Sequence, residues 1–224
     1  MKNGNSLSIT RLIAVPALIT LAVTILRLVG ELQHWPSLLF NSAAGGWGAI
    51  VGIPWLPIIF GPYFAIKLAS AGEGPASAGK SIGFALLGGV AWFVFLFAAF
   101  RILPKHPWLS LPFFVLTLAA MFIPGIGWGS LGRTLIAYAL TARIPVLIVM
   151  YLALSGNGGQ GWGTHYDRVM AQLAHATVLR KWMIEALVPQ ATMWMGWTVC
   201  LGAIVGTIVS ALAYRGKQTT EAAA

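Results

Sequence analysis

Charged side chains are scarce in this sequence. Only 8% of its 224 residues are Asp, Glu, Lys or Arg, whereas a soluble domain has about 25%. Acidic residues are the rarest, with five Asp and Glu against 14 Lys and Arg, and 58% of all residues are hydrophobic. This composition excludes an ordinary soluble domain and predicts an integral membrane protein. The basic residues are spread along the chain, which suits lipid headgroups and predicts no nucleic-acid partner.

The sequence also lacks paired cysteines and several common catalytic signatures. Its single cysteine, Cys200, excludes an intramolecular disulfide and a zinc site built from cysteine pairs. His-Glu-x-x-His does not occur, and no apolar run contains a pair of aspartates. These absences favour a non-enzymatic protein, for which we expect no cofactor and no metal.

Long apolar runs are abundant. A helix needs about 20 residues to cross a bilayer, and six runs approach that length: 9–30, 46–68, 81–102, 108–126, 131–154 and 191–213. They predict an all-α polytopic membrane helix bundle, with one transmembrane domain over 1–224 and both termini on the same side. The first run has no cleavage site after it, so we expect an uncleaved first span.

The two sides of the membrane are named here by their loops. The odd face is reached by the loops after the first, third and fifth runs, and the even face carries the termini and the other two loops. Slightly more Lys and Arg lie near the even face. The positive-inside rule therefore favours cytoplasmic termini, in a cell inner membrane.

A further helix is expected between the fifth and sixth runs. Apolar residues recur there at helical spacing, with polar residues between them: Val169, Leu173, Ala176, Leu179, Met183 and Leu187. This pattern predicts an amphipathic helix over about 166–188 that lies in the membrane interface.

An arginine, Arg143, lies near the middle of the run 131–154. At this depth it costs at least ~2.5–3.5 kcal/mol on insertion scales, so it normally faces protein, water or a bound anion. Pro145 has no N–H and frees the carbonyl of Thr141. Tyr138 and Thr141 are therefore candidate partners, in a ligand or lipid site or in a purely structural arrangement.

The second run combines glycines with prolines. The pentapeptide GAIVG occurs twice, placing Gly48 and Gly52 in the second run and Gly202 and Gly206 in the sixth. Glycines four residues apart let helix backbones approach closely, within one chain or between subunits. Three prolines follow in the second run, which predicts either a kinked packing helix or unwound backbone.

Polar residues gather on the odd face. Glu31 and His34 are spaced to share a helix face, and His165, Tyr166 and Asp167 belong to the loop after the fifth run. We expect a polar pocket lined by Glu31, His34, His165 and Tyr166, provided that the first and fifth spans are neighbours. A metal or catalytic role and a hydrogen-bonded loop anchor are the alternatives.

Two local pairings compete with such a role. Thr164 and Asp167 have capping-box spacing, so Asp167 is expected to face its own helix N-terminus. Arg27 and Glu31 are four residues apart and can form an ion pair at the membrane surface.

Three functions are compatible with these patterns. The first, which we favour because only one ionisable group lies deep in a span, is a non-enzymatic accessory or interaction component, whose partners are the lipid bilayer, other membrane subunits or a second copy of the chain. The second is a small permease or channel with a path lined by the second span and Arg143. The third is a membrane enzyme that uses the Glu and His residues of the odd face. A water-filled route to Arg143 would favour transport, and a dry Arg143 would favour the accessory role.

Overall fold

The computed structural model describes residues 7–44, 48–103 and 105–221. These form an all-α bundle without a β-strand in the described part, as the apolar runs predicted. The helices are α1 Ile9–Leu32, α2 Leu56–Ser70, α3 Ala78–Ile102, α4 Pro107–Ala120, α5 Ile123–Gly127, α6 Gly129–Gly159, α7 Val178–Trp182 and α8 Met195–Glu221. Within the described ranges, six helical segments are long and apolar enough to cross a membrane. The prediction of a multi-pass helical membrane protein is confirmed.

The second span begins later than the sequence predicted. It runs over Ile53–Ser70, whereas we expected 46–68, of which residues 46 and 47 lie outside the described part. Gly52 is extended, and a single 3-10 turn, Ile53–Trp55, leads into α2. Two of the three prolines therefore stand in the first turns of helices, where a missing N–H breaks no hydrogen bond. Pro62 alone lies inside α2.

The prediction of one interfacial helix over 166–188 is wrong. Its first half forms two isolated 3-10 turns, His165–Asp167 and Ala171–Leu173. The extended backbone of Arg168, with ψ of 128°, ends the first of these turns. Its second half belongs to the sixth span, Val178–Tyr214, where Leu179 and Met183 of the apolar stripe are exposed on the outside of the bundle.

The sixth span contains two wide, π-helical turns, Met183–Leu187 and Gln190–Trp194. They flank Pro189, whose missing N–H interrupts the regular hydrogen-bond ladder. Three tryptophan indoles fix this half of the span to its neighbours: Trp92 donates to the carbonyl of Thr192, Trp182 to that of Leu147 and Trp197 to that of Pro54, each at 2.9 Å.

Glycines allow close contact between α2 and α8. A Cβ on Gly61 would lie 2.7 Å from the Gly202 Cα, and one on Gly206 would lie 2.7 Å from the Gly61 carbonyl oxygen. The Gly202–Gly206 strip therefore packs against α2 of the same chain. Phe64, Leu135 and Val199 are fully buried beside it.

The Gly48–Gly52 pair has a different environment from the one expected. Gly48 has a φ of +83° and Gly52 precedes the helix, so the two do not form a strip on a helix. A Cβ on Gly52 would lie 2.9 Å from Arg27 Nη1. Gly52 thus leaves room for a buried arginine of α1.

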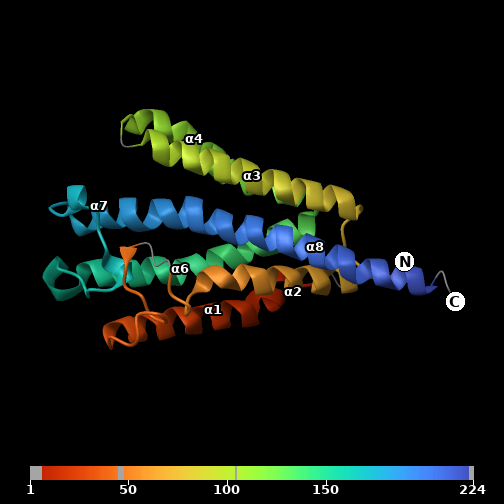
Figure 1. Ribbon diagram of the computed structural model, residues 1–224, viewed down its shortest axis with the longest axis horizontal. Coiled ribbons are helices and arrows are strands. Elements are labelled where there is room, and N and C mark those ends of the chain that lie inside the picture. Colours follow the sequence, from red (N-terminus) through yellow and green to blue (C-terminus); the bar gives the residue numbers. More distant parts are fainter. Residues whose placement is uncertain (1–6, 45–47, 104, 222–224) are drawn as a thin grey trace.

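The two ends of the chain lie at the same end of the bundle. Figure 1 shows α1 beginning and α8 ending in the same direction, with the α3–α4 hairpin on one side. At this even face Ser70 Oγ lies 3.0 Å from the hydroxyl of Tyr214, and the backbone N–H of Leu7 donates to Glu73 at 2.9 Å. These contacts join the start of α1, the α2–α3 loop and α8.

Replacing Gly61 tests the close helix contact. Gly61→Ala is expected to lower the free energy of unfolding by about 1–3 kcal/mol, because the new methyl group meets backbone that cannot move aside cheaply. Gly83→Ala is the matched control, since Gly83 lies in α3 with no atom near its Cβ position. Thermal unfolding in detergent, followed by circular dichroism, measures both. Equal stability of the two variants would contradict the contact.

Candidate functional site

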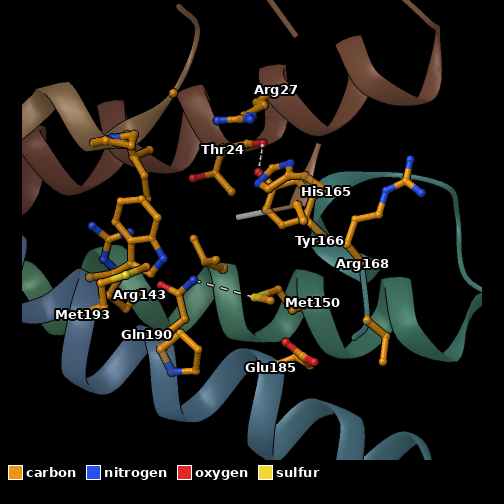
Figure 2. Close-up of a pocket in the computed structure, with 18 of the residues that line it drawn as sticks. Thr24, Arg27, Arg143, Met150, His165, Tyr166, Arg168, Glu185, Gln190 and Met193 are labelled. Carbon is orange, nitrogen blue, oxygen red and sulfur yellow. Dashed lines mark hydrogen bonds between the residues drawn. The ribbon is translucent and has the colours of Figure 1, made fainter. Parts of the chain in front are cut away.

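A cavity of about 350 Å³ lies in the odd-face half of the bundle. Its wall comes from α1, the segment between α1 and α2, Phe100 of α3, α6, the first half of the sixth span and the loop that contains His165. Figure 2 shows Arg143, Gln190 and Met193 together at one end, and His165, Tyr166 and Arg168 together at the other. We name it the Arg143 cavity, with a deep end at Arg143 and a mouth at Arg168.

The deep end is organised by Arg143 of α6. Its Nη2 donates to Thr198 Oγ1 at 2.9 Å, and its guanidinium lies 5.4 Å from the centre of the Trp194 ring. Both partners belong to the sixth span. A cation over a tryptophan face is stabilised electrostatically, more strongly where water is excluded.

The expected partners of Arg143 on its own helix form other bonds. The hydroxyl of Tyr138 lies 2.8 Å from Thr20 Oγ1 of α1. Thr141 is exposed on the outside of the bundle, and its hydroxyl donates to the Tyr138 carbonyl at 2.9 Å. Residues two apart on a helix do not share a face, so Thr141 points away from Arg143.

Two buried atoms at the deep end have no hydrogen-bond partner within the described part of the chain. They are Arg143 Nε, a donor, and Gln190 Oε1, an acceptor. Their residues are only 4% and 6% exposed. The Gln190 amide nitrogen lies 3.7 Å from the sulfur of Met150. Leaving a buried polar group unsatisfied costs about 1–3 kcal/mol, so both atoms favour a bound polar ligand.

Local backbone geometry aims these groups at the cavity. Gln190, Trp194 and Thr198 recur every four residues, and the wide turn Gln190–Trp194 shifts the register of the first two. Single π-helical turns often occur at functional sites because they redirect side chains. In the sequence, the feature that could have indicated this end of the cavity is the single amide of Gln190, which stands at the start of an apolar run.

The mouth is built around Glu31 at the end of α1. Glu31 Oε1 accepts from Arg27 Nε at 2.9 Å and lies 2.5 Å from His165 Nδ1, and Glu31 Oε2 accepts from the His165 backbone N–H at 2.7 Å. The Glu31 side chain is fully buried. The hydroxyl of Tyr166 donates to the carbonyl of Thr24 at 3.3 Å. These bonds attach the loop after α6 to α1.

The structure brings Glu31, His165 and Tyr166 together but excludes His34. The latter follows the end of α1 with a φ of +54° and is exposed. Asp167 accepts from the backbone N–H and hydroxyl of Thr164, which completes the expected capping box. Glu31 does not line the cavity itself, because Arg27 and His165 stand between.

The charge of the cavity is net positive. Its wall carries the guanidinium groups of Arg27, Arg143 and Arg168 against one carboxylate, Glu185, while Glu31 neutralises Arg27. Burial lowers the pKa of His165, an effect opposed by the hydrogen bond to Glu31 and reinforced by the nearby charge of Arg27. His165 is therefore neutral at pH 7.

A sequence match to a nucleotide-binding loop is not supported by its surroundings. Residues 74–81, GPASAGKS, have the Gly-x-x-x-x-Gly-Lys-Ser spacing of a phosphate-binding loop, which needs a preceding strand. Here α2 precedes it. The hydroxyl of Ser81 is buried and donates to the Ala78 carbonyl at 2.9 Å, so it does not face a ligand.

No group of three or more His, Cys, Asp or Glu residues in the described ranges could hold a metal ion. No protein-family model, curated protein or solved structure matches the chain.

The Arg27–Glu31 pair provides a test of the mouth. Glu31→Leu is expected to lower the free energy of unfolding by about 3–5 kcal/mol, because it leaves a buried arginine without its carboxylate. The double variant Arg27→Leu/Glu31→Leu should recover part of this loss, since it removes both charges. Thermal unfolding of the purified protein measures the difference. A double variant no more stable than Glu31→Leu would contradict a buried ion pair.

A pH titration tests His165. The unfolded chain binds a proton at His with a pKa near 6.5, above the lowered pKa of folded His165. The contribution of His165 to the free energy of unfolding should therefore be fully present above about pH 6.5. It should be lost as the pH drops below that value, by at most about 1.4 kcal/mol per pH unit.

The matched variants separate this histidine from the others. His165→Gln is expected to reduce the loss of thermal stability between pH 7 and pH 5.5. His34→Gln, at an exposed position, should leave it unchanged. An identical pH profile for wild type and His165→Gln would rule out the assignment.

Proposed function

We propose that this protein is a small permease that binds an anionic ligand in the Arg143 cavity. The observation that carries the proposal is the buried Nε–H of Arg143, which lines the cavity and has no acceptor within the described chain. A net positive wall attracts anions and focuses their field at a low-dielectric site. The volume, about 350 Å³, is at the lower end for ligand pockets and suits a small molecule.

The position of the cavity supports transport. It lies in the odd-face half, while the even-face half is closed by the α2–α8 glycine contact and by Phe60, Phe64 and Tyr138. A transporter in one of its two end states has this asymmetry, with a site near the midplane that is open to one side. We propose cytoplasmic termini in a cell inner membrane, and with that orientation the cavity would open to the outer side.

The irregular backbone of the sixth span would supply the movement. Irregular helices at membrane depth are common in transporters, where they line a cavity. Here Pro189 and residues of the two wide turns beside it, among them Glu185, Gln190 and Trp194, line the Arg143 cavity. We expect a tilt of the first half of the sixth span to close the odd face.

An accessory role in a membrane assembly is the second candidate. It is favoured by an apolar groove on the outside of the bundle between α6 and α7, whose wall includes Ile148, Tyr151, Leu179 and Trp182. A lipid, another membrane subunit or a second copy of the chain would fit this groove. The glycine strip Gly202–Gly206 does not add to this case, because α2 already covers it. An enzymatic role for Glu31 is disfavoured, since Arg27 and His165 engage both of its oxygens.

Ligand-induced stabilisation tests anion binding. The purified protein is heated with sodium acetate, 4-methylpentanoate, succinate or phosphate, each against sodium chloride at equal ionic strength. A ligand at 100 times its Kd stabilises the folded state by about 2.7 kcal/mol, so at least one anion should raise the unfolding midpoint. Uptake of that anion into proteoliposomes then separates a permease from an accessory subunit.

Arg143→Leu is expected to abolish both ligand-induced stabilisation and uptake. Without ligand, its stability should be unchanged or higher, because an apolar side chain replaces a buried charge with an unsatisfied donor. Arg133→Leu, on the exposed even-face end of α6, controls for loss of one positive charge. If Arg143→Leu is less stable and still responds to anions, Arg143 is structural and the proposal fails.

A further inference from the structure

The deep end of the Arg143 cavity presents a donor and an acceptor together. Arg143 Nε offers an N–H and Gln190 Oε1 offers a lone pair, both buried and without a partner in the described chain. The guanidinium lies over Trp194, one turn beyond Gln190 on the same span. A single small ligand can therefore reach both groups, as their grouping in Figure 2 indicates.

Both groups are held in place by neighbouring side chains. Thr198 binds one terminal nitrogen of Arg143, and Trp194 covers a face of its guanidinium. The amide nitrogen of Gln190 contacts the Met150 sulfur, which leaves its carbonyl oxygen for the ligand. Such preorganisation lowers the entropy cost of binding.

The rest of the deep end is apolar. Val146, Met150, Met193 and Ile53 line it beside Trp194. Methionine side chains adapt to apolar groups of different shape. A purely inorganic anion would leave this surface without a contact, so the wall favours a ligand with an apolar portion.

We infer that the ligand is a small amphipathic carboxylic acid with a hydrogen-bond donor on the carbon next to its carboxylate, that is, an α-amino or α-hydroxy acid with an apolar side chain. The carboxylate accepts from Arg143, the ammonium or hydroxyl group donates to Gln190 Oε1, and the side chain packs against Met150 and Met193. This inference rests on the proposed function and specifies its substrate class.

Three acids of one carbon skeleton and one decarboxylated amine test this pairing: leucine, 2-hydroxy-4-methylpentanoate, 4-methylpentanoate and 3-methylbutylamine. The first two carry both groups, the third lacks the donor and the fourth lacks the carboxylate. Their Kd values are measured by microscale thermophoresis on wild-type protein in detergent. Leucine, its hydroxy analogue, or both should bind about tenfold to a hundredfold more tightly than 4-methylpentanoate, because the latter leaves Gln190 Oε1 buried and unpaired. The amine should not bind measurably.

Two variants assign the discrimination to Gln190. Gln190→Leu and the volume-matched Gln190→Met should bind 4-methylpentanoate as tightly as the α-substituted acids, while Arg143→Leu should bind none of them. Thr141→Val, on the lipid-facing side of the helix that carries Arg143, is the control and should retain the wild-type preference. Because the ligand series is decisive on wild-type protein, an unstable variant does not remove the test.

The outcomes separate this inference from the proposed function. Equal, Arg143-dependent binding of leucine and 4-methylpentanoate would overturn the donor–acceptor pairing and leave anion binding intact. Binding of phosphate without any of the carboxylates would do the same. If no anion, organic or inorganic, binds to the wild-type protein, the inference and the permease proposal both fail.

Discussion

Arginine side chains at membrane depth impose the main constraint on this fold. A guanidinium cannot be left to lipid, so each buried arginine needs polar or aromatic partners within the protein. Arg27 finds Glu31 one turn along α1, together with the carbonyl of Asn41. Arg143 finds Thr198 and Trp194 on the sixth span. Arg143 therefore joins α6 to the sixth span, and Arg27 joins α1 to the segment that follows it.

The bundle is tightly closed at one end and open at the other, and both properties have local causes. Towards the even face, Gly61, Gly202 and Gly206 bring α2 and α8 into backbone contact. Towards the odd face, the wide turns around Pro189 keep the start of the sixth span irregular. Tryptophan N–H groups from α3 and from the sixth span itself bond to carbonyls across this region. These bonds position the walls of the Arg143 cavity in this state, as a ligand site requires.

Parts of the site followed from the sequence. Glu31, His165 and Tyr166 were expected together because the first and fifth spans end on the same face. Their contact depended on α1 and α6 being neighbours, which the Thr20–Tyr138 bond now demonstrates. The prediction that His34 lines the same pocket is wrong, because the chain turns through a positive φ at His34, after α1. Thr198, the partner of Arg143, is 55 residues distant along the chain, and helical spacing predicts contacts only within one helix.

The sequence by itself determined the class of the molecule and the number of its spans, because apolar length and scarce charge depend on composition and local order alone. It also located the buried arginine and the capping box, which are features of one or two turns. Only the tertiary structure decided which helices meet, that the second glycine strip packs inside the chain, and that 166–188 is not one helix. It also decided that Arg143 and Gln190 share a cavity. Such contacts depend on how segments distant in the sequence pack together. The same apolar pattern is compatible with several arrangements of the helices, and the packing of side chains selects one of them.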